Sequence, residues 1–580
     1  MRCLALCLTF TLLLGGIASD GSANGKSAYF GDLHIHTGLS LDAFAFGVVA
    51  TPDDAIRFAR GKPIEHVAGH RIQMQTPLDF VAITDHAEYL GVFAAMRDSS
   101  HPLSKTTLAQ DLYSGDSGRV ERGIARMKHS VFNNQPMSEF LTKEIIENMW
   151  TRSVTAAEHG NQPGEFTSFI AFEWSATPNA ANLHRNVIFA GDREAVPPTP
   201  FSARDSQKPA ALWDYLDQSR AKYGQVIAIP HNSNLSDGRM FPAYTNQGEN
   251  SAQRARNEPL VEITQIKGSS ETHPLLSPND EWADFELLEE LMGGGDKKGK
   301  LSGSYTRDAL KQGLLFLQEG SANPYQFGFV GSSDSHNASS PVEENNYSGK
   351  IGRGDGTPQT RREGGSINSS NLHYSAAGLT GVWAEENTRA SIFAALKRRE
   401  TFATTGTRIQ LRLDALQEGK DSIAMGGVFT SAGDKAPLLR ARASMDANSA
   451  SLQRLQIVKG WLRDGELMES ITDIACGSGA TPEASSGRCP EEDATVDMKS
   501  CKPESGAGAP QLSAHWQDTD FRPEEEAFYY LRALEHPSCR WSSWDSIRMG
   551  WDLPLKAPAT IQERAWSSPI WYRPAIRKSS

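Results

Sequence analysis

The chain has 580 residues, of which 39% are hydrophobic and 22% are charged, and its formal net charge is −12. This composition supports large hydrophobic cores and excludes both a small disulfide-knotted module and a disordered polyelectrolyte. Because acidic residues outnumber basic ones and no long basic run occurs, we expect no wrapping of nucleic acid.

The first residues are typical of a secretory signal. Met1 and Arg2 give a short positive start, residues 4–14 are almost wholly apolar, and small residues follow. We therefore predict a signal peptide over residues 1–18 and a secreted or periplasmic protein. The apolar stretch is much shorter than the roughly 20 residues of a membrane-spanning helix, so we expect no membrane span; a retained anchor is the alternative.

Four cysteines follow this segment, and all of them lie in the last fifth of the chain. They are Cys476, Cys489, Cys501 and Cys539. An even number of cysteines in an oxidising compartment predicts two disulfides. The spacing lacks the close pairs of a zinc ribbon, which disfavours a metal site. Four cysteines allow three pairings, and the sequence does not choose among them.

From Tyr29 to about Glu385, short apolar runs that end in polar residues alternate with helix-like stretches. Uninterrupted apolar runs are typical of strands buried on both faces, and the alternation predicts an α/β fold, either a β/α barrel or a doubly wound sheet. The predicted strands are 29–36, 80–86, 168–173, 186–190, 226–231, 260–266, 327–336 and 379–384, and the predicted helices include 52–59, 210–223, 281–292 and 306–318.

The remaining segments differ in character. Three long polar stretches, 91–163, 232–257 and 337–371, are interpreted as insertions or lids, with ordinary solvated loops as the alternative. Beyond residue 407, alternating patterns predict half-buried strands. The predicted organisation is a signal peptide (1–18), a β/α barrel with insertions (27–406) and a β-rich, sandwich-like C-terminal domain (407–580).

Histidines and acids stand at the ends of several predicted strands. His34 and His36 lie two residues apart and therefore on one face of a strand, and Asp334 and His336 repeat this arrangement. Oxygen and nitrogen ligands without cysteine suit two or three divalent ions such as Zn²⁺, Mn²⁺ or Fe²⁺. The candidate metal ligands are His34, His36, Asp42, His86, Glu173, His184, His231, Asp334 and His336.

The order of these motifs is informative. The motif-bearing segments are Gly31–Thr37, Ile83–His86, Glu173, Ile229–Asn232 and Ser333–His336. Together they resemble the motif set of the polymerase and histidinol phosphatase (PHP) superfamily. Residues 29–34 and 565–572 are similar to a large secreted bacterial branch of that superfamily. The resemblance covers residues 29–385 and implies a distorted seven-stranded β/α barrel with up to three metal ions at its carboxyl-end mouth.

The resemblance also implies how the ligands are shared. One ion takes His34, His36, Glu173 and Asp334; a second shares Glu173 and adds His184 and His231; the third takes Asp42, His86 and His336. Two positions depart from the pattern. Relatives often have histidine where Asp42 stands, and His184 precedes a strand instead of ending one. If either Asp42 or His184 is not a ligand, the expected number of metal ions falls from three towards two.

These features predict a metal-dependent hydrolase of a small anionic ester, a phosphate or phosphonate, that uses a hydroxide bridging two metal ions. Candidates for holding a substrate oxygen or supplying a proton are Arg185, Lys267, Arg239 and His373, chosen because they neighbour the motifs. Asp85 stands beside His86 and is expected to orient a ligand histidine. For each of these residues, an ordinary structural or surface role is the alternative.

Two other functions remain open. A metal hydrolase can also cleave carboxylic esters, amides or sulfate esters, because the metal does not dictate the electrophile. The chain could instead be a non-catalytic, metal-stabilised binding protein whose C-terminal tryptophans hold a partner. Tryptophans in a β-rich domain more often form its core, which favours the enzyme.

Overall fold

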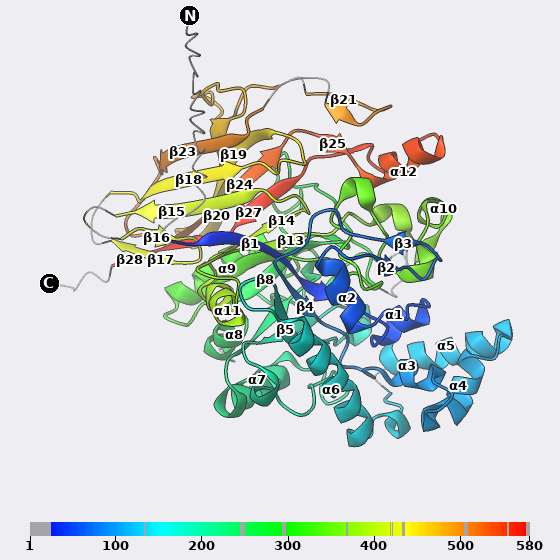
Figure 1. Ribbon diagram of the computed structural model, residues 1–580. Coiled ribbons are helices and arrows are strands. Elements are labelled where there is room, and N and C mark those ends of the chain that lie inside the picture. Colours follow the sequence, from blue (N-terminus) through cyan, green and yellow to red (C-terminus); the bar gives the residue numbers. More distant parts are fainter. Residues whose placement is uncertain are drawn as a thin grey trace, which may run out of the picture.

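The computed structural model describes residues 25–132, 135–243, 250–292, 297–366, 369–417, 419, 421–431, 435–492, 494–503, 508–553 and 556–575. The predicted signal peptide over residues 1–18 lies outside these ranges. Figure 1 shows β1 (Ser27–Ile35) in the middle of the molecule, with strands from the last third of the chain on one side and most helices from the first half on the other.

One long mixed sheet runs through the protein. β1 pairs in parallel with β4 (Phe80–Ile83), and β4 pairs in parallel with β5 (Thr167–Trp174). The order continues antiparallel through β6 (Arg185–Phe189) and β7 (Val226–Pro230). On the other side of β1 the order is β13 (Leu379–Ala384), β14 (Thr401–Thr404), β27 (Arg564–Ser567), β24 (Ala527–Glu535), β28 (Ile570–Pro574) and β17 (Val428–Ser431), with β19 (Leu452–Arg463) and β20 (Glu466–Cys476) joined through β24.

A second, smaller sheet contains β10 (Gly328–Gly331), β8 (Leu260–Gln265) and β9 (Gly268–Ser269). The segment after β10 lies beside the carboxyl end of β1. Beyond β10, the amide of Asp334 donates to the carbonyl of His34 (2.7 Å), and the amide of His36 donates to the carbonyl of Ser335 (2.8 Å). The carboxyl ends of β1, β4, β5 and β10 therefore converge. In the part of the chain that the structure describes, no ladder joins β7 to β8, so a closed seven-stranded barrel stays a prediction.

The sequence located these strands well. All eight predicted strands are present, as β1, β4 to β8, β10 and β13, and the predicted helices 52–59, 210–223 and 306–318 match α2 (Pro52–Ala59), α7 (Pro209–Tyr223) and α9 (Thr306–Gln318). α2 begins with a capping box in which the amide of Asp54 donates to the Thr51 hydroxyl and the Asp54 carboxylate accepts from the Thr51 amide, with proline at the first helical position.

The predicted helix over 281–292 was wrong, because this segment forms turns. Its side chains are held by distant partners instead of by helical neighbours. Glu286 binds the guanidinium of Arg540 and adopts a left-handed backbone with φ of 42°. The indole of Trp282 donates to Gln562. Tertiary contacts therefore override the local helical pattern.

Further helices cover the lower part of Figure 1 or connect the sheets. They are α1 (Leu41–Ala45), α3 (Val92–Arg97), α4 (Thr107–Leu112), α5 (Ser117–Phe132), α6 (Lys143–Gly160), α8 (Ser251–Asn257), α10 (Pro358–Glu363), α11 (Arg389–Arg398) and α12 (Trp541–Met549). α3 to α6 belong to the 91–163 segment, which is thus a largely helical insertion between β4 and β5. Short two-stranded ladders are β2 (Ile64–Glu65) with β3 (Arg71–Ile72), β11 (Gly365–Ser366) with β12 (Ser369–Ser370), β21 (Val496–Asp497) with β22 (Lys502–Pro503), and β25 (Ser538–Cys539) with β26 (Thr560–Ile561).

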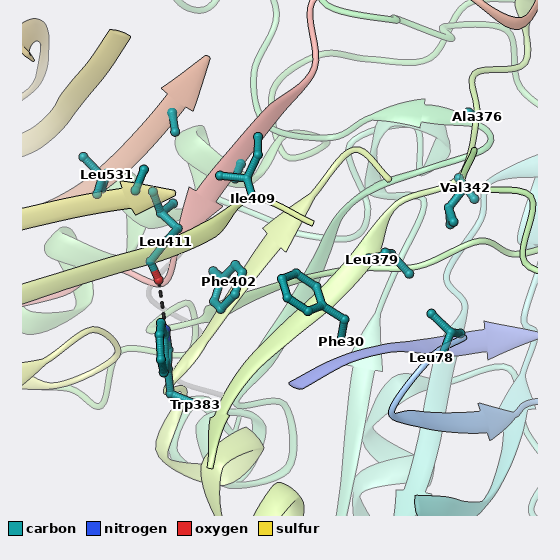
Figure 2. Packing of buried hydrophobic residues seen from close by; sticks show 14 of the residues in the cluster. Phe30, Leu78, Val342, Ala376, Leu379, Trp383, Phe402, Ile409, Leu411 and Leu531 are labelled. Carbon is teal, nitrogen blue, oxygen red and sulfur yellow. Dashed lines mark hydrogen bonds between the residues drawn. The ribbon is translucent and has the colours of Figure 1, made fainter. Parts of the chain in front are cut away.

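The C-terminal strands pack against the long sheet. A four-stranded antiparallel sheet has the order β16 (Ile423–Ala424), β15 (Gln410–Leu416), β18 (Leu438–Ser444) and β23 (Gln511–Gln517). Its buried face shares one apolar cluster with the long sheet, in which Leu411 and Leu531 lie near Phe402 and Phe30 (Figure 2). The indole of Trp383 donates to the Leu411 carbonyl at 2.9 Å and joins the two layers.

The domain boundary at 406/407 stays a prediction, and the long sheet crosses it, since β14 pairs with β27. Trp541, Trp566 and Trp571 are buried, so these three indoles contribute to packing. Within the described ranges no helix combines the length and apolar character needed to cross a bilayer.

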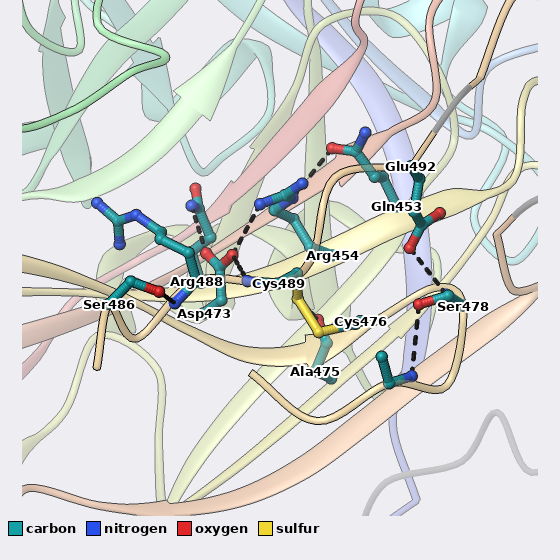
Figure 3. The surroundings of a disulfide bond; sticks show 12 residues. Gln453, Arg454, Asp473, Ala475, Cys476, Ser478, Ser486, Arg488, Cys489 and Glu492 are labelled. Atoms are coloured by element: carbon teal, nitrogen blue, oxygen red, sulfur yellow. Dashed lines mark hydrogen bonds and ion pairs between the residues drawn. A yellow bond between two sulfur atoms is a disulfide. The ribbon is translucent and has the colours of Figure 1, made fainter. Parts of the chain in front are cut away.

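Two disulfides tie the C-terminal loops. Cys476 pairs with Cys489, and Cys501 pairs with Cys539. Figure 3 shows the first of them beside Asp473, whose carboxylate accepts from the Cys489 amide (2.7 Å) and from the Arg454 guanidinium (2.8 Å). The predicted number of disulfides is confirmed, and the structure supplies the pairing that the sequence left open.

Candidate metal centre

Glu173, the penultimate residue of β5, lies at the centre of the histidine cluster. Its Oε1 is 2.8 Å from Nδ1 of His184 and 3.2 Å from Nε2 of His231. Its Oε2 is 3.1 Å from Nε2 of His36, 3.2 Å from Nδ1 of His86 and 3.5 Å from Nε2 of His34. One buried carboxylate therefore contacts five imidazoles, and each of its oxygens faces a different subset of them.

Asp334 lies on the other side of His34 and His36. Its Oδ1 is 3.6 Å from Nε2 of His34, 3.5 Å from Nε2 of His36 and 3.3 Å from Nδ1 of His336. The residue has a φ of 56°, a left-handed conformation that is uncommon for non-glycine residues and is concentrated at functional sites. Because Glu173 and Asp334 both lie close to Nε2 of His34 and of His36, the site has two acidic centres that share these histidines.

Asp42 joins the cluster from the short helix α1. Its two oxygens lie 3.3 Å from Nε2 of His86 and 2.9 Å from Nε2 of His336. The Asp42 side chain is 32% exposed, whereas the imidazoles of His34, His36 and His231 are fully buried. The cluster is thus closed at its base and open to solvent on the Asp42 side.

The strand directions explain why His184 belongs to the cluster although it precedes a strand. β6 is antiparallel to β5, so the residue before β6 lies at the same edge as the carboxyl end of β5. The amide of His231, which follows β7, donates to the His184 carbonyl and joins the two segments. The position that departed from the PHP pattern therefore falls beside Glu173.

Asp85 supports the cluster indirectly, through Ser40. The Asp85 carboxylate accepts hydrogen bonds from the Thr37 amide and hydroxyl and from the Ser40 hydroxyl (2.6 to 2.7 Å). Because Ser40 donates its only hydroxyl proton to Asp85, its oxygen can only accept from Nδ1 of His36, 2.9 Å away. This chain of bonds holds the His36 proton on Nδ1 and turns its Nε2 lone pair towards Glu173.

Burial and mutual charge shape the pKa values here. Burial alone would raise the pKa of Glu173, but the surrounding histidines, His86 first, hold it well below the usual range. Burial would lower the pKa of His34, but Asp334 and Glu262 raise it to about 10. Burial, His336 and His86 lower the pKa of His36 to about 3. The cluster therefore combines ionised carboxylates with a neutral imidazole, His36, and with His34, whose protonation at neutral pH balances the buried carboxylates.

Three of the predicted substrate-binding residues are not brought to the cluster. Arg185 is buried, and its guanidinium donates to Glu258 (2.9 Å) and to the Leu183 carbonyl (2.6 Å). His373 and Arg239 are exposed, and no contact described in the structure joins either of them to the histidines. The geometry thus gives no support to a substrate contact by Arg185, His373 or Arg239.

Lys267 is brought to the cluster, where its Nζ lies 2.5 Å from Oδ2 of Asp334. The sequence reasoning missed two further residues. Lys350 is buried, and its Nζ lies 3.2 Å from Oδ1 of Asp334. Glu262, on β8, lies 3.0 Å from Nδ1 of His34. A single glutamate inside the apolar run 260–266 was the available signal for Glu262, whereas Lys350 lies in a long polar segment without such a signal.

A family described as "Protein of unknown function (DUF3604)" matches residues 23–574 of the chain. The chain belongs to the DUF3604 family. A comparison with curated proteins found no match. The matched range contains both the strands that carry the histidines and the C-terminal sheets.

This DUF3604 protein is also similar to a solved structure from Bacteroides vulgatus, described as a two-domain protein containing a predicted PHP-like metal-dependent phosphoesterase. The two chains are 9% identical, and the match covers 87% of this chain and 91% of the other, with a TM-score of 0.30. Similarity at this level does not establish a shared fold, so the chemistry of the DUF3604 site is argued from its own residues.

Proposed function

We propose that this DUF3604 protein is a metal-dependent hydrolase of phosphate or phosphonate esters with a PHP-like site of two or three divalent cations. One observation carries the proposal: the Glu173 carboxylate contacts five imidazoles with both of its oxygens. A carboxylate that faces separate groups of histidines with its two oxygens is suited to bridge two cations.

The donor atoms fit this interpretation. Nε2 of His34 and of His36 are buried and have no hydrogen-bond partner, which is costly for a polar atom unless a ligand fills the place. The donors are nitrogen and oxygen without thiolate, as Zn²⁺, Mn²⁺ and Fe²⁺ accept. The residues that would hold three cations are His34, His36, Glu173 and Asp334; Glu173, His184 and His231; and Asp42, His86 and His336.

Divalent cations at such a site polarise phosphoryl oxygens and make water a stronger nucleophile at neutral pH. The protein's own part is to bind and orient. Lys267 and Lys350 place two ammonium groups at Asp334, where their positive charge can attract an anionic ester to the cluster. Ser40 and Asp85 fix the ring of His36, and the partly exposed Asp42 marks the side from which a substrate enters.

The decisive experiment pairs metal analysis with hydrolysis. Purified protein is analysed for bound metals, and hydrolysis of chromogenic phosphomonoesters, phosphodiesters and phosphonates is measured before and after chelation. His34→Ala should lower both metal content and turnover, whereas the matched variant His373→Ala, at an exposed histidine outside the cluster, should change neither. Full metal content in His34→Ala would remove His34 from the ligand set.

The same panel separates the alternative functions. Cleavage of sulfate or carboxylic esters without cleavage of phosphoesters would move the reaction to another ester class. Lys267 and Lys350 carry one more positive charge than the Asp334 carboxylate that they contact, which favours an anionic ester over a neutral carboxylic ester or amide. If chelation lowers the melting temperature but no ester is cleaved, the metals serve stability and the protein is a binding module.

We also propose that the protein works outside the cytoplasm, secreted or periplasmic. The two disulfides support an oxidising compartment. Residues 1–24 fused to a periplasmic reporter enzyme should export it, and the same fusion with Leu12→Arg in the apolar stretch should not.

A further inference from the structure

Glu262 lies within β8 and faces the base of the histidine cluster. Its side chain is 1% exposed, and its Oε2 lies 3.0 Å from Nδ1 of His34. His34, His231 and Glu262 each place a ligand atom within 4.8 Å of the other two. Glu262 therefore approaches two candidate ligand histidines from the side opposite to Glu173.

Two atoms in this group have no hydrogen-bond partner. Nδ1 of His231 and Oε1 of Glu262 are both buried and unpaired. The ring centroids of His34 and His231 are 4.1 Å apart, so one carboxylate can reach both rings with its two oxygens. A buried acceptor and a buried potential donor on two residues of the same three-residue group form the simplest pair that would satisfy both.

We propose that Glu262 is a positioning residue that accepts the Nδ1 protons of both His34 and His231. Each ring then keeps a proton on Nδ1, which leaves Nε2 as the nitrogen that faces the cluster and is free to bind a cation. This agrees with the observed orientation, because Nε2 of His34 and of His231 lie 3.5 Å and 3.2 Å from the Glu173 carboxylate.

The effect on metal binding rests on the proposed function. A carboxylate that accepts from the remote nitrogen of a ligand histidine fixes the tautomer and raises the basicity of the ligating nitrogen, and its loss typically costs 10- to 100-fold in metal affinity. The Ser40 hydroxyl, which donates to Asp85, likewise accepts the Nδ1 proton of His36. Glu262 differs in serving two histidines that are assigned to two different cations.

Glu262→Gln is the sharpest test because it keeps the volume but replaces one acceptor oxygen with an NH₂ group. Only one of the two histidines can then keep its Nδ1–H bond. Zn²⁺ binding, measured by equilibrium dialysis and elemental analysis, should weaken by 10- to 100-fold for at least one ion. The absorption spectrum of the Co²⁺-loaded protein should also change.

The matched control is Glu258→Gln. Glu258 is a buried carboxylate just before β8, and it binds Arg185 and Arg254 (2.9 Å each) away from the cluster. This variant should lower the melting temperature but keep Zn²⁺ affinity and stoichiometry. Equal weakening of Zn²⁺ binding in both variants, or unchanged binding in Glu262→Gln, would overturn the proposal.

A second measurement does not depend on metal. Nitrogen NMR of histidine-labelled, metal-free protein at neutral pH should show His231 in the Nδ1–H tautomer, whereas His34, with its pKa raised to about 10, should be protonated on both nitrogens. In Glu262→Gln, His231 should shift to Nε2–H because the remaining acceptor oxygen is taken by His34. An Nε2–H tautomer for His231 in the wild type would overturn the positioning role. If the wild type binds no Zn²⁺ but shows the Nδ1–H tautomer of His231, the proposed hydrolase fails while the role of Glu262 stands.

Discussion

Nζ of Lys267 lies 2.5 Å from Oδ2 of Asp334, and this lysine is one of two that hold the same carboxylate. Lys350 lies 3.2 Å from Oδ1 and also donates to the Asp334 backbone carbonyl, while the Gln265 amide donates to Oδ2. Burial would raise the pKa of Asp334, but Lys267 and Lys350 hold it well below the usual range. Asp334 is therefore ionised and fixed in place independently of any cation.

Lys267→Met tests whether this ammonium group acts on the substrate. We expect kcat/KM for a phosphoester to fall by about 10- to 100-fold, because a hydrogen bond to a charged group contributes about 1.5 to 3 kcal/mol. Bound metal should stay unchanged, since Gln265 and Lys350 still hold Asp334. Lys311→Met, which removes a lysine paired with Glu469 outside the cluster, should keep full turnover. Normal kinetics in Lys267→Met would show that this lysine serves only to balance Asp334.

Glu173→Gln should disturb more than one cation, because Glu173 contacts five imidazoles whereas His184 contacts Glu173 from the edge of the cluster. We expect Glu173→Gln to lose at least two metal equivalents and His184→Ala to lose one, as measured by elemental analysis. Turnover of Glu173→Gln should fall by at least about 100-fold, since metal ions contribute several kcal/mol to transition-state stabilisation. Loss of the same single equivalent from both variants would contradict a bridging role for Glu173.

Much of this arrangement could be predicted from the sequence because its strands are buried on both faces. β5 is buried along its whole length, and its residues 169–172 form an uninterrupted apolar run that ends just before Glu173. Polar residues at the ends of such runs stand out, and strand ends that meet at one edge bring them together. His34, His36 and Glu173 were found in this way.

Arg185 shows where proximity in sequence misleads. It directly follows His184, but successive residues of an extended chain point to opposite faces. When His184 faces Glu173, the neighbouring side chain must turn away, and it meets Glu258. The same rule of parity would have excluded Arg185, whereas the exposure of His373 depends on the course of a loop that the sequence pattern does not specify.

Contacts between residues far apart in the sequence were the second limit on what could be predicted. Lys350 contacts Asp334, which lies 16 residues earlier in the chain, and no local sequence pattern predicts that this lysine is buried. The turns over 281–292 depend on Arg540 and Gln562, which lie more than 250 residues later. Such contacts are decided by the packing of the whole chain and are invisible to the periodicity of one segment.

Removing the Cys501–Cys539 disulfide should lower the free energy of unfolding of the protein. The two cysteines are separated by 38 residues, and a loop of this size corresponds to about 3 to 4 kcal/mol of stabilisation through the unfolded chain. We expect the double variant Cys501→Ala, Cys539→Ala to unfold at lower denaturant concentration by this amount. The Cys476–Cys489 loop spans 13 residues, so its removal should cost less, about 3 kcal/mol. A larger loss for the shorter loop would contradict the chain-entropy argument.

Glu535, the last residue of β24, makes stability depend on pH in an unusual direction. Burial raises the pKa of its carboxyl to about 8, from an ordinary value of 4.5, although the Ser449 hydroxyl donates to it. Because the folded state holds the proton more tightly than the unfolded state, Glu535 contributes most to stability below about pH 4.5, and this contribution is lost as the pH rises to about 8. The slope for one such group reaches about 1.4 kcal/mol per pH unit.

Glu535→Gln should remove this slope, because glutamine is neutral at every pH. We expect the variant to exceed the wild type in free energy of unfolding at pH 8.5 and to lose this advantage at pH 4.5, with denaturant titrations at a series of pH values as the measurement. The exposed residue Glu483 provides the control, since Glu483→Gln should keep the wild-type slope. If Glu535→Gln is less stable than the wild type at pH 8.5, the carboxylate is stabilised by an interaction that outweighs its burial.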